Sequence, residues 1–73
     1  MIIKKEYKGN HAIKYTLIDN IEKIDVNTDQ DLTYINVYKN NRKNQDDFET
    51  INVIAMNVYI CNDTGKTLAI YRG

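Results

Sequence analysis

Short runs in which apolar and polar residues alternate recur along this chain of 73 residues, and they limit the folds that it can adopt. Residues 13–17 and 32–39 show the pattern most clearly. Because successive side chains of a strand point to opposite faces of a sheet, a period of two is typical of half-buried strands. Ile, Val, Tyr and Thr, which fit a pleated surface, total 27, and proline is absent. We therefore expect an all-β or mostly β fold.

Polar turns between these runs divide the chain into five to seven short strands. The expected strands cover residues 2–8, 12–18, 21–26, 32–39 and 67–71, with one or two more between 48 and 61. No linker divides the chain, so residues 1–73 are expected to be a single small domain. We expect a small antiparallel sheet that curls toward a barrel or a two-layer sandwich.

The segments between the expected strands have the composition of loops and turns. Residues 27–31 and 40–47 are strongly polar and are expected to be exposed loops. The sequence at 62–65 is typical of a hairpin turn, in which Gly65 is able to take a positive φ.

Residues 48–61 fit three local structures. Ile51 and Val53 share one strand face, whereas the apolar residues from 54 to 60 share the opposite one. A bulge near that change, or a bend between two separate strands, accounts for it. The third possibility is a short helix near 46–56, because the apolar residues also have a helical spacing and a preceding Asp would cap it. Ile, Asn and Val are mediocre helix formers, which favours the two β alternatives.

Charge and cysteine content argue against several classes of protein. Lys and Arg number 10, as do Asp and Glu, so the net charge of zero argues against binding nucleic acid mainly by bulk electrostatics. The single cysteine cannot form an internal disulfide. The first residues lack the apolar stretch of a signal peptide, and the longest uncharged run, 50–62, is too short and polar to cross a bilayer. We expect a cytoplasmic protein without a membrane partner.

The composition also indicates a source. Ile, Asn, Lys and Tyr, whose codons are rich in A and T, account for 35 of the 73 residues. This excess predicts a gene from a low-GC bacterium or from one of its phages or mobile elements.

One segment has the alternating oxygen side chains of a calcium-binding loop. Asp, Asn, Asp and Asp stand at every second position of 25–31, but Gln30 replaces the glycine of the sharp turn and Asn36 replaces the bidentate Glu. His11 and Cys61 are each the only residue of their kind, which gives neither a metal-ligand set nor a recognisable nucleophile and base pair. No metal or cofactor is expected.

Two further motifs have enzymatic counterparts. Residues 63–65 spell the Asp-Thr-Gly triplet of aspartic proteases, whose chemistry needs two carboxylates that share a proton. Residues 65–67 copy the end of a Walker A loop, but Ile60 stands where the loop needs its first glycine. Both triplets fit a hairpin that faces water, and we expect a protein that is not an enzyme.

The tyrosines are the remaining candidates for function. Tyr34 and Tyr38 share a face of one expected strand, and two more lie in the terminal hairpin on parities opposite to its most apolar faces. If these strands are neighbours, the rings line one sheet surface beside a small basic patch. Such rings anchor protein interfaces or stack on unpaired bases, or they form a second wall of the core. The candidate interaction surface comprises Tyr34, Tyr38, Lys39, Arg42, Lys43, Tyr59 and Tyr71.

These observations predict a small binding protein without catalytic activity. It is expected to dock a protein partner, or a second copy of itself, through the tyrosine-bearing face or through an edge strand. The alternative is a single-stranded nucleic-acid-binding protein built as a small OB-like barrel. Zero net charge with only two arginines makes the nucleic-acid partner the less favoured of the two.

Overall fold

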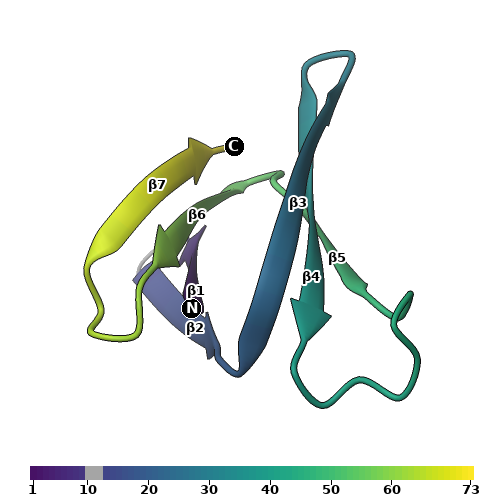
Figure 1. Cartoon of the computed structure of the whole chain (residues 1–73). Coiled ribbons are helices and arrows are strands. Elements are labelled where there is room, and N and C mark those ends of the chain that lie inside the picture. The colour runs from purple at the N-terminus through teal and green to yellow at the C-terminus, as the bar shows by residue number, and fades with distance from the viewer. Residues whose placement is uncertain (10–12) are drawn as a thin grey trace.

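The computed structural model describes residues 1–9 and 13–73, and these residues form seven strands and no helix (Figure 1). The strands are β1 (Ile2–Lys8), β2 (Ile13–Ile18), β3 (Ile21–Asp29), β4 (Leu32–Lys39), β5 (Glu49–Asn52), β6 (Met56–Cys61) and β7 (Thr67–Arg72). The all-β class that the alternation predicts is confirmed, as is a strand number between five and seven. His11 and the expected beginning of the second strand at residue 12 lie outside the described residues.

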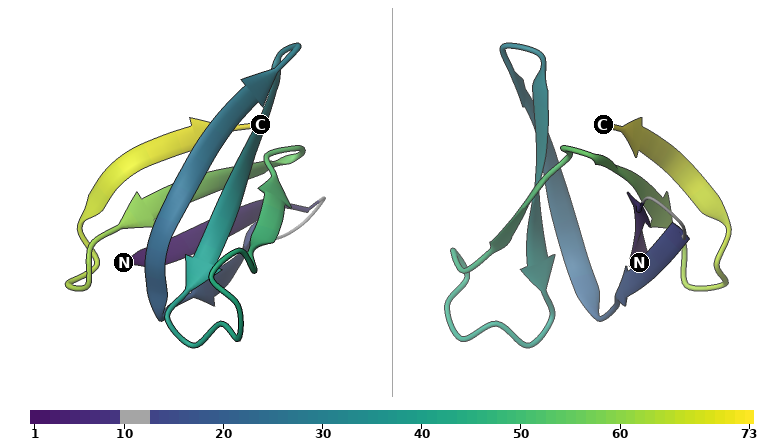
Figure 2. Two further views of the ribbon diagram at one scale, coloured as in Figure 1. Left: turned by 45° about the vertical axis from the view of Figure 1, so that its right-hand side comes forward. Right: turned by 180° about the vertical axis from the view of Figure 1, so that it is seen from behind.

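Within the described residues the strands form two antiparallel sheets rather than one closed barrel. The four-stranded sheet has the order β2-β1-β6-β7, and the three-stranded sheet has the order β3-β4-β5. The chain passes between the sheets after β2 and again after β5, and Figure 2 shows the two sheets as separate layers. Each crossing is short, so the two layers are held close together.

The core lies between the two layers and consists mainly of β-branched side chains. Its largest fully buried members are Ile3 and Val58 from the four-stranded sheet and Ile35 and Val37 from β4. Burial of each such side chain stabilises the fold by about 1.5–3 kcal/mol. Both sheets therefore contribute to one core, although no strand pairing joins them in the described part of the chain.

The change of apolar parity in the 48–61 segment marks a crossing between the sheets. Ile51 and Val53 face the core from the three-stranded sheet, and Val58 faces it from the other sheet. The bend between β5 and β6 includes Ala55, which has a φ of 54°. Of the three local structures that fit the sequence, the structure has two separate strands with a bend between them, and it has no helix there. Ile54, expected on the core face, is 58% exposed because it lies in the bend itself.

The turn between β3 and β4 is shorter than predicted. Gln30 and Asp31 have φ values of 49° and 67°, and a two-residue hairpin turn of the primed type needs positive φ at both positions. Because β3 continues to Asp29, the expected loop at 27–31 is mostly strand. The oxygen side chains of the calcium-like segment therefore alternate along a strand and do not form a loop.

The turn between β6 and β7 is the one that the sequence predicts. Gly65 has a φ of 89°, and its N–H donates to the Asn62 carbonyl at 3.0 Å. The Asn62 side-chain oxygen accepts hydrogen bonds from the backbone of Thr64 at 3.1 Å and of Lys66 at 2.9 Å. A single asparagine side chain thus closes the turn, as Asn does in many tight turns.

Candidate interaction surface

The four-stranded sheet exposes the most apolar side of β2 to solvent. In its pairing with β1, Ile18 lies opposite Ile3 on the core face, so alternate residues of β2 point outward. These residues are Ile13, Tyr15 and Leu17, exposed at 59%, 54% and 66%. The six residues of β2 therefore carry their apolar row on the face away from the core.

β7 adds apolar residues at the other edge of the same sheet. Leu68 and Ile70 are exposed at 61% and 44%, whereas Ala69 and Tyr71 pack against the core. Ile70 lies opposite Tyr59 of β6. The outer apolar face, as we call this surface, is defined by Ile13, Tyr15, Leu17, Tyr59, Leu68 and Ile70.

A lysine lies at the centre of the outer apolar face. The β1 residue Lys4 is opposite Leu17 on one side and Tyr59 on the other. Its ammonium nitrogen lies 5.1 Å from the ring centroid of Tyr15 and 4.7 Å from that of Tyr59. Each such cation–π contact is worth roughly 0.5–1 kcal/mol at an exposed site. The lysine therefore bridges two aromatic rings and fills the space between the apolar edges.

Hydrogen bonds from Asn57 and Tyr59 hold a carboxylate in the next row of this face. The side-chain nitrogen of Asn57 donates to one oxygen of Glu6 at 2.9 Å, and the Tyr59 hydroxyl donates to the other at 3.3 Å. Asn57 is only 3% exposed. The hydrogen bond to Glu6, with smaller contributions from desolvation and repulsion between charges, raises the pKa of Tyr15. The two outer tyrosines of the sheet are therefore both tied to β1.

The residues predicted as one interaction surface lie on different surfaces. β4 belongs to the three-stranded sheet and β6 and β7 to the other, so the strands that carry the tyrosines are not neighbours. Tyr34 and Tyr38 are on the outer face of the three-stranded sheet, and Tyr59 is on the outer apolar face. Tyr71 packs against the core. The condition for a single tyrosine surface, that these strands are neighbours, is therefore not met. The alternation within any one strand does not encode strand order.

Tyr38 forms a smaller aromatic cluster of its own. Its ring lies 5.4 Å from that of Phe48, with 4.5 Å to the Lys23 nitrogen and 5.7 Å to the Arg42 guanidinium carbon. Desolvation, followed by the nearby Asp25 carboxylate, raises the pKa of Tyr38. Because Phe48, Lys23 and Arg42 surround its ring, Tyr38 is only partly exposed, whereas Tyr15 on the outer apolar face is 54% exposed.

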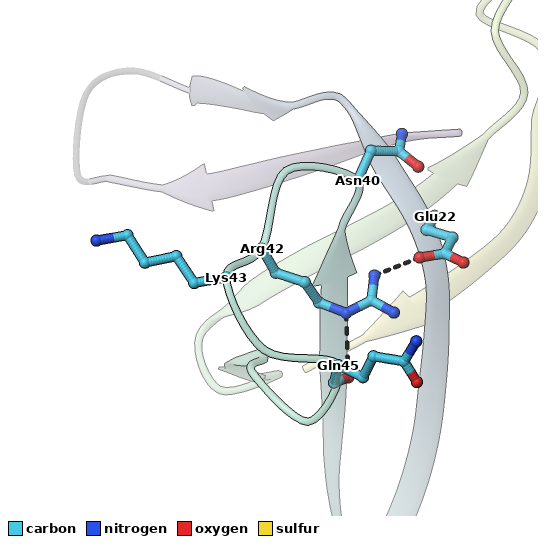
Figure 3. A pocket seen from close by; sticks show the side chains of 5 residues that line it. All are labelled: Glu22, Asn40, Arg42, Lys43 and Gln45. Atoms are coloured by element: carbon cyan, nitrogen blue, oxygen red, sulfur yellow. Dashed lines mark hydrogen bonds and ion pairs between the residues drawn. The ribbon is translucent and has the colours of Figure 1, made fainter.

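Two of the three residues of the expected basic patch, Lys39 and Arg42, form hydrogen bonds or ion pairs within the chain. Arg42 forms an ion pair with Glu22, and its guanidinium also donates to the carbonyl of Gln45 at 3.0 Å and to that of Lys39 at 2.8 Å. Only 14% of the Arg42 side chain is exposed. Arg42, Glu22 and Gln45 help to line a polar pocket of about 250 Å³. Figure 3 shows the Arg42 side chain directed at Glu22 and the Lys43 side chain pointing away.

The contacts of Lys39 and Arg42 hold the 40–48 loop in place and do not form a ligand site. Lys39 donates to the Asp19 carbonyl at 2.8 Å, so it fixes the chain beside the first crossing between the sheets. Arg42 ties the loop to β3 in the same way. Of the three predicted basic residues, Lys43 alone extends into solvent without a hydrogen bond in the described part of the chain.

Other chemical groups are sparse among the described residues. Within residues 1–9 and 13–73 no three His, Cys, Asp or Glu side chains are close enough to hold a metal ion. Cys61 is a buried free thiol whose sulfur lies 3.8 Å from the Thr67 hydroxyl. No helix in this part of the chain is long and apolar enough to cross a bilayer.

Sequence reasoning missed the outer apolar face although its residues are plain in the sequence. The alternation of Ile13, Tyr15 and Leu17 resembles that of a core strand, and a hydrophobic pattern does not say which face is covered. One signal was present: Ile18 and Ile21 flank a two-residue turn, and Ile18 lies on the parity opposite to the apolar row. At this crossing the two flanking apolar residues lie on the core side of their strands.

Comparisons of this chain with models of protein families, with curated proteins and with solved structures found no match. Its class is defined by its own geometry: a small antiparallel β protein of two sheets, one of which exposes an apolar face. The function is therefore argued from that face.

Proposed function

We propose that this chain is a small binding protein without catalytic activity and that it docks a protein partner on the outer apolar face. The observation that carries the proposal is the exposure of Ile13, Tyr15 and Leu17 in one row, with Ile70 across the same face. Exposed contiguous apolar patches on soluble proteins mark interaction surfaces, and tyrosines with an apolar body and a polar tip are common anchors there.

The shape of the surface supports a macromolecular partner rather than a small molecule. Small-molecule sites are concave and mainly apolar, whereas this face belongs to an open sheet. The pocket beside Arg42 is polar, and two of the residues that line it, Arg42 and Glu22, are paired with each other. The charged groups of the face, Lys4 and Glu6, are held by neighbouring aromatic and amide side chains, which fits a pre-organised docking surface.

The proposed setting is the cytoplasm of a low-GC bacterium, with the protein encoded by the cell or by a phage or mobile element. The codon-linked excess of Ile, Asn, Lys and Tyr supports the source. A free buried thiol at Cys61 is compatible with a reducing compartment.

Three variants test the docking surface. Leu17→Asp and Ile70→Asp each place a charge on the outer apolar face, and Ile54→Asp places one on an equally exposed apolar residue in the bend. We expect a partner captured by the wild-type protein, then purified, to lose at least about tenfold in affinity for the first two variants by calorimetry. Ile54→Asp should bind like the wild type. Equal binding by all three variants would place the docking site elsewhere.

Single-stranded nucleic acid is the alternative partner. Tyr15 and Tyr59 lie beside Lys4 on an open sheet face, and aromatic rings next to a cation form the usual stacking platform for unpaired bases. The net charge of zero weighs against it. Fluorescence anisotropy with a labelled oligothymidine at about 50 mM salt separates the two, since a nucleic-acid site binds there and weakens steeply with added salt.

A further inference from the structure

The edge of the four-stranded sheet at β2 is open, and it is the least protected edge in the described part of the chain. β5 is only four residues long. β3 and β7 each carry one extra residue in their pairing, Glu22 and Leu68. Short length and bulges are two ways in which proteins prevent one edge from pairing with another. β2 pairs over all six of its residues without a register shift, and Lys14 is its only charged side chain.

The sequence of β2 is suited to antiparallel pairing with itself. When Tyr15 lies opposite Tyr15 of a second copy, Ile13 lies opposite Leu17, so the outward row is apolar at every position. Lys14 then lies opposite Thr16 on the other face. Directly opposed like charges destabilise a sheet, and this register avoids them.

Neighbouring registers are less favourable. If the two-fold axis passes beside residue 14 instead of residue 15, Lys14 lies opposite Lys14 of the second copy. If the axis passes beside residue 16, Ile13 lies opposite Asp19 of the second copy, which is beyond the end of the strand. The register centred on Tyr15 is therefore the one that satisfies both faces of β2.

We infer that the protein forms a two-fold symmetric dimer in which β2 of one copy pairs with β2 of a second copy in this register. The dimer has one continuous sheet of eight strands, and the two outward rows of β2 lie side by side across the axis. The inference rests on the proposed function, because it names a second copy of this chain as a partner for the surface that includes β2. The dimer also covers β2, which is the one edge of the two sheets within residues 1–9 and 13–73 that has neither a bulge nor a short strand.

A pair of substitutions at Thr16 tests the register. Thr16 is exposed and lies opposite Lys14 of the second copy, a contact that the two-fold axis repeats. Thr16→Glu creates two attractive pairs and Thr16→Lys two repulsive ones. Sedimentation equilibrium should show dimer dissociation constants shifted about 2- to 30-fold from wild type, tighter for Glu and weaker for Lys.

Within one chain Thr16 also faces Lys5, so a double variant serves as the control. Lys14→Glu with Thr16→Lys restores opposite charges across the axis and retains the new lysine beside Lys5. The double variant has two attractive pairs across the axis, as Thr16→Glu does, so it should dimerise at least as tightly as the wild type. Urea unfolding confirms that each variant is folded. Three results would overturn the inference: a wild type that stays monomeric at millimolar concentration, equal shifts for Thr16→Glu and Thr16→Lys, or no recovery in the double variant.

The failure of this inference differs from the failure of the proposed function. The substitutions at Thr16 leave the outward row of Ile13, Tyr15 and Leu17 unchanged. A protein that is monomeric but loses an unrelated partner on Leu17→Asp retains its docking face and lacks the β2 dimer. A protein that follows the Thr16 charge series but binds no other protein forms the β2 dimer and lacks the proposed docking function of the outer apolar face.

Discussion

At the scale of single residues, the outer apolar face is organised by a few contacts that fix its aromatic side chains. Lys4 lies between two tyrosine rings, and Glu6 accepts hydrogen bonds from Asn57 and Tyr59. These contacts reduce the rotamer freedom that a partner would otherwise have to restrict, which lowers the entropic cost of binding. They also connect the titration of Tyr15 to the charge of Glu6.

The link between Tyr15 and Glu6 predicts a pH effect with a definite sign. The folded-state pKa of Tyr15 is raised above its ordinary value of 10.0, so this group contributes stability below pH 10 that is lost as the pH rises through the folded pKa. Glu6→Gln removes the negative charge, and the Tyr15 pKa should fall back toward 10.0. An NMR titration of the ring carbons of Tyr15 measures it. Glu49→Gln, on the other sheet, should leave the Tyr15 pKa unchanged, and an unaltered pKa in Glu6→Gln would contradict the assigned cause.

At the scale of elements, the crossings between the sheets decide which face of each strand is buried. β5 and β6 are separated by three residues, yet Ile51 of β5 and Val58 of β6 reach the same core from different sheets. The bend that makes this possible places Ala55 at a φ of 54°, a conformation that disfavours residues with a Cβ atom.

The bend therefore predicts a stabilising glycine substitution. Ala55→Gly relieves the left-handed strain and should raise the free energy of unfolding by up to about 1 kcal/mol in urea titrations. Ala69→Gly, in the interior of β7, is the matched control and should lower it, since Gly costs about 0.5–1 kcal/mol in a strand. A loss of stability in Ala55→Gly would show that the bend does not carry this strain.

At the scale of the whole molecule, two thin layers share a core to which a minority of the apolar residues belong. Ile35 is fully buried, while Leu17, with a similar side chain in an equally regular strand, is 66% exposed. The difference lies in the layer arrangement: β4 is the central strand of its sheet and faces the other layer, whereas β2 is an edge strand whose apolar row faces outward.

The two positions should respond differently to the same change. Ile35→Ala removes a buried side chain and should cost about 2–5 kcal/mol in the free energy of unfolding. Leu17→Ala should change it by less than about 0.5 kcal/mol, because little burial is lost. Urea unfolding followed by circular dichroism, at low protein concentration, compares the two. A large loss in Leu17→Ala would instead place the outward row of β2 in the core.

Most of the secondary structure could be predicted from the sequence, because alternation and turn chemistry are local. The expected strands at 2–8 and 32–39 coincide with β1 and β4, and Gly65 takes the positive φ that its turn requires. The loop at 27–31 was predicted too long because its Asn and Asp residues favour turns, while cross-strand pairing with β4 extends β3 to Asp29. At these residues the hydrogen-bonded pairing with β4 outweighs the turn propensity of Asn and Asp.

The candidate site was less predictable, since it depends on which strands are neighbours. Four of the tyrosines share one surface only if their strands adjoin, and the strand order separates them. Of that set, Tyr59 lies on the outer apolar face, beside residues that the sequence had presented as ordinary strand positions.

The sequence by itself determined the β class, the strand segments and the turns, because each of these depends on interactions between residues close in the chain. It also determined that β2 and β7 each have one apolar side. Only the tertiary structure decided that these apolar sides face solvent, since the assignment depends on strand order and on two crossings between layers. Burial is a property of what lies opposite a face, and the alternation within one strand carries no information about that.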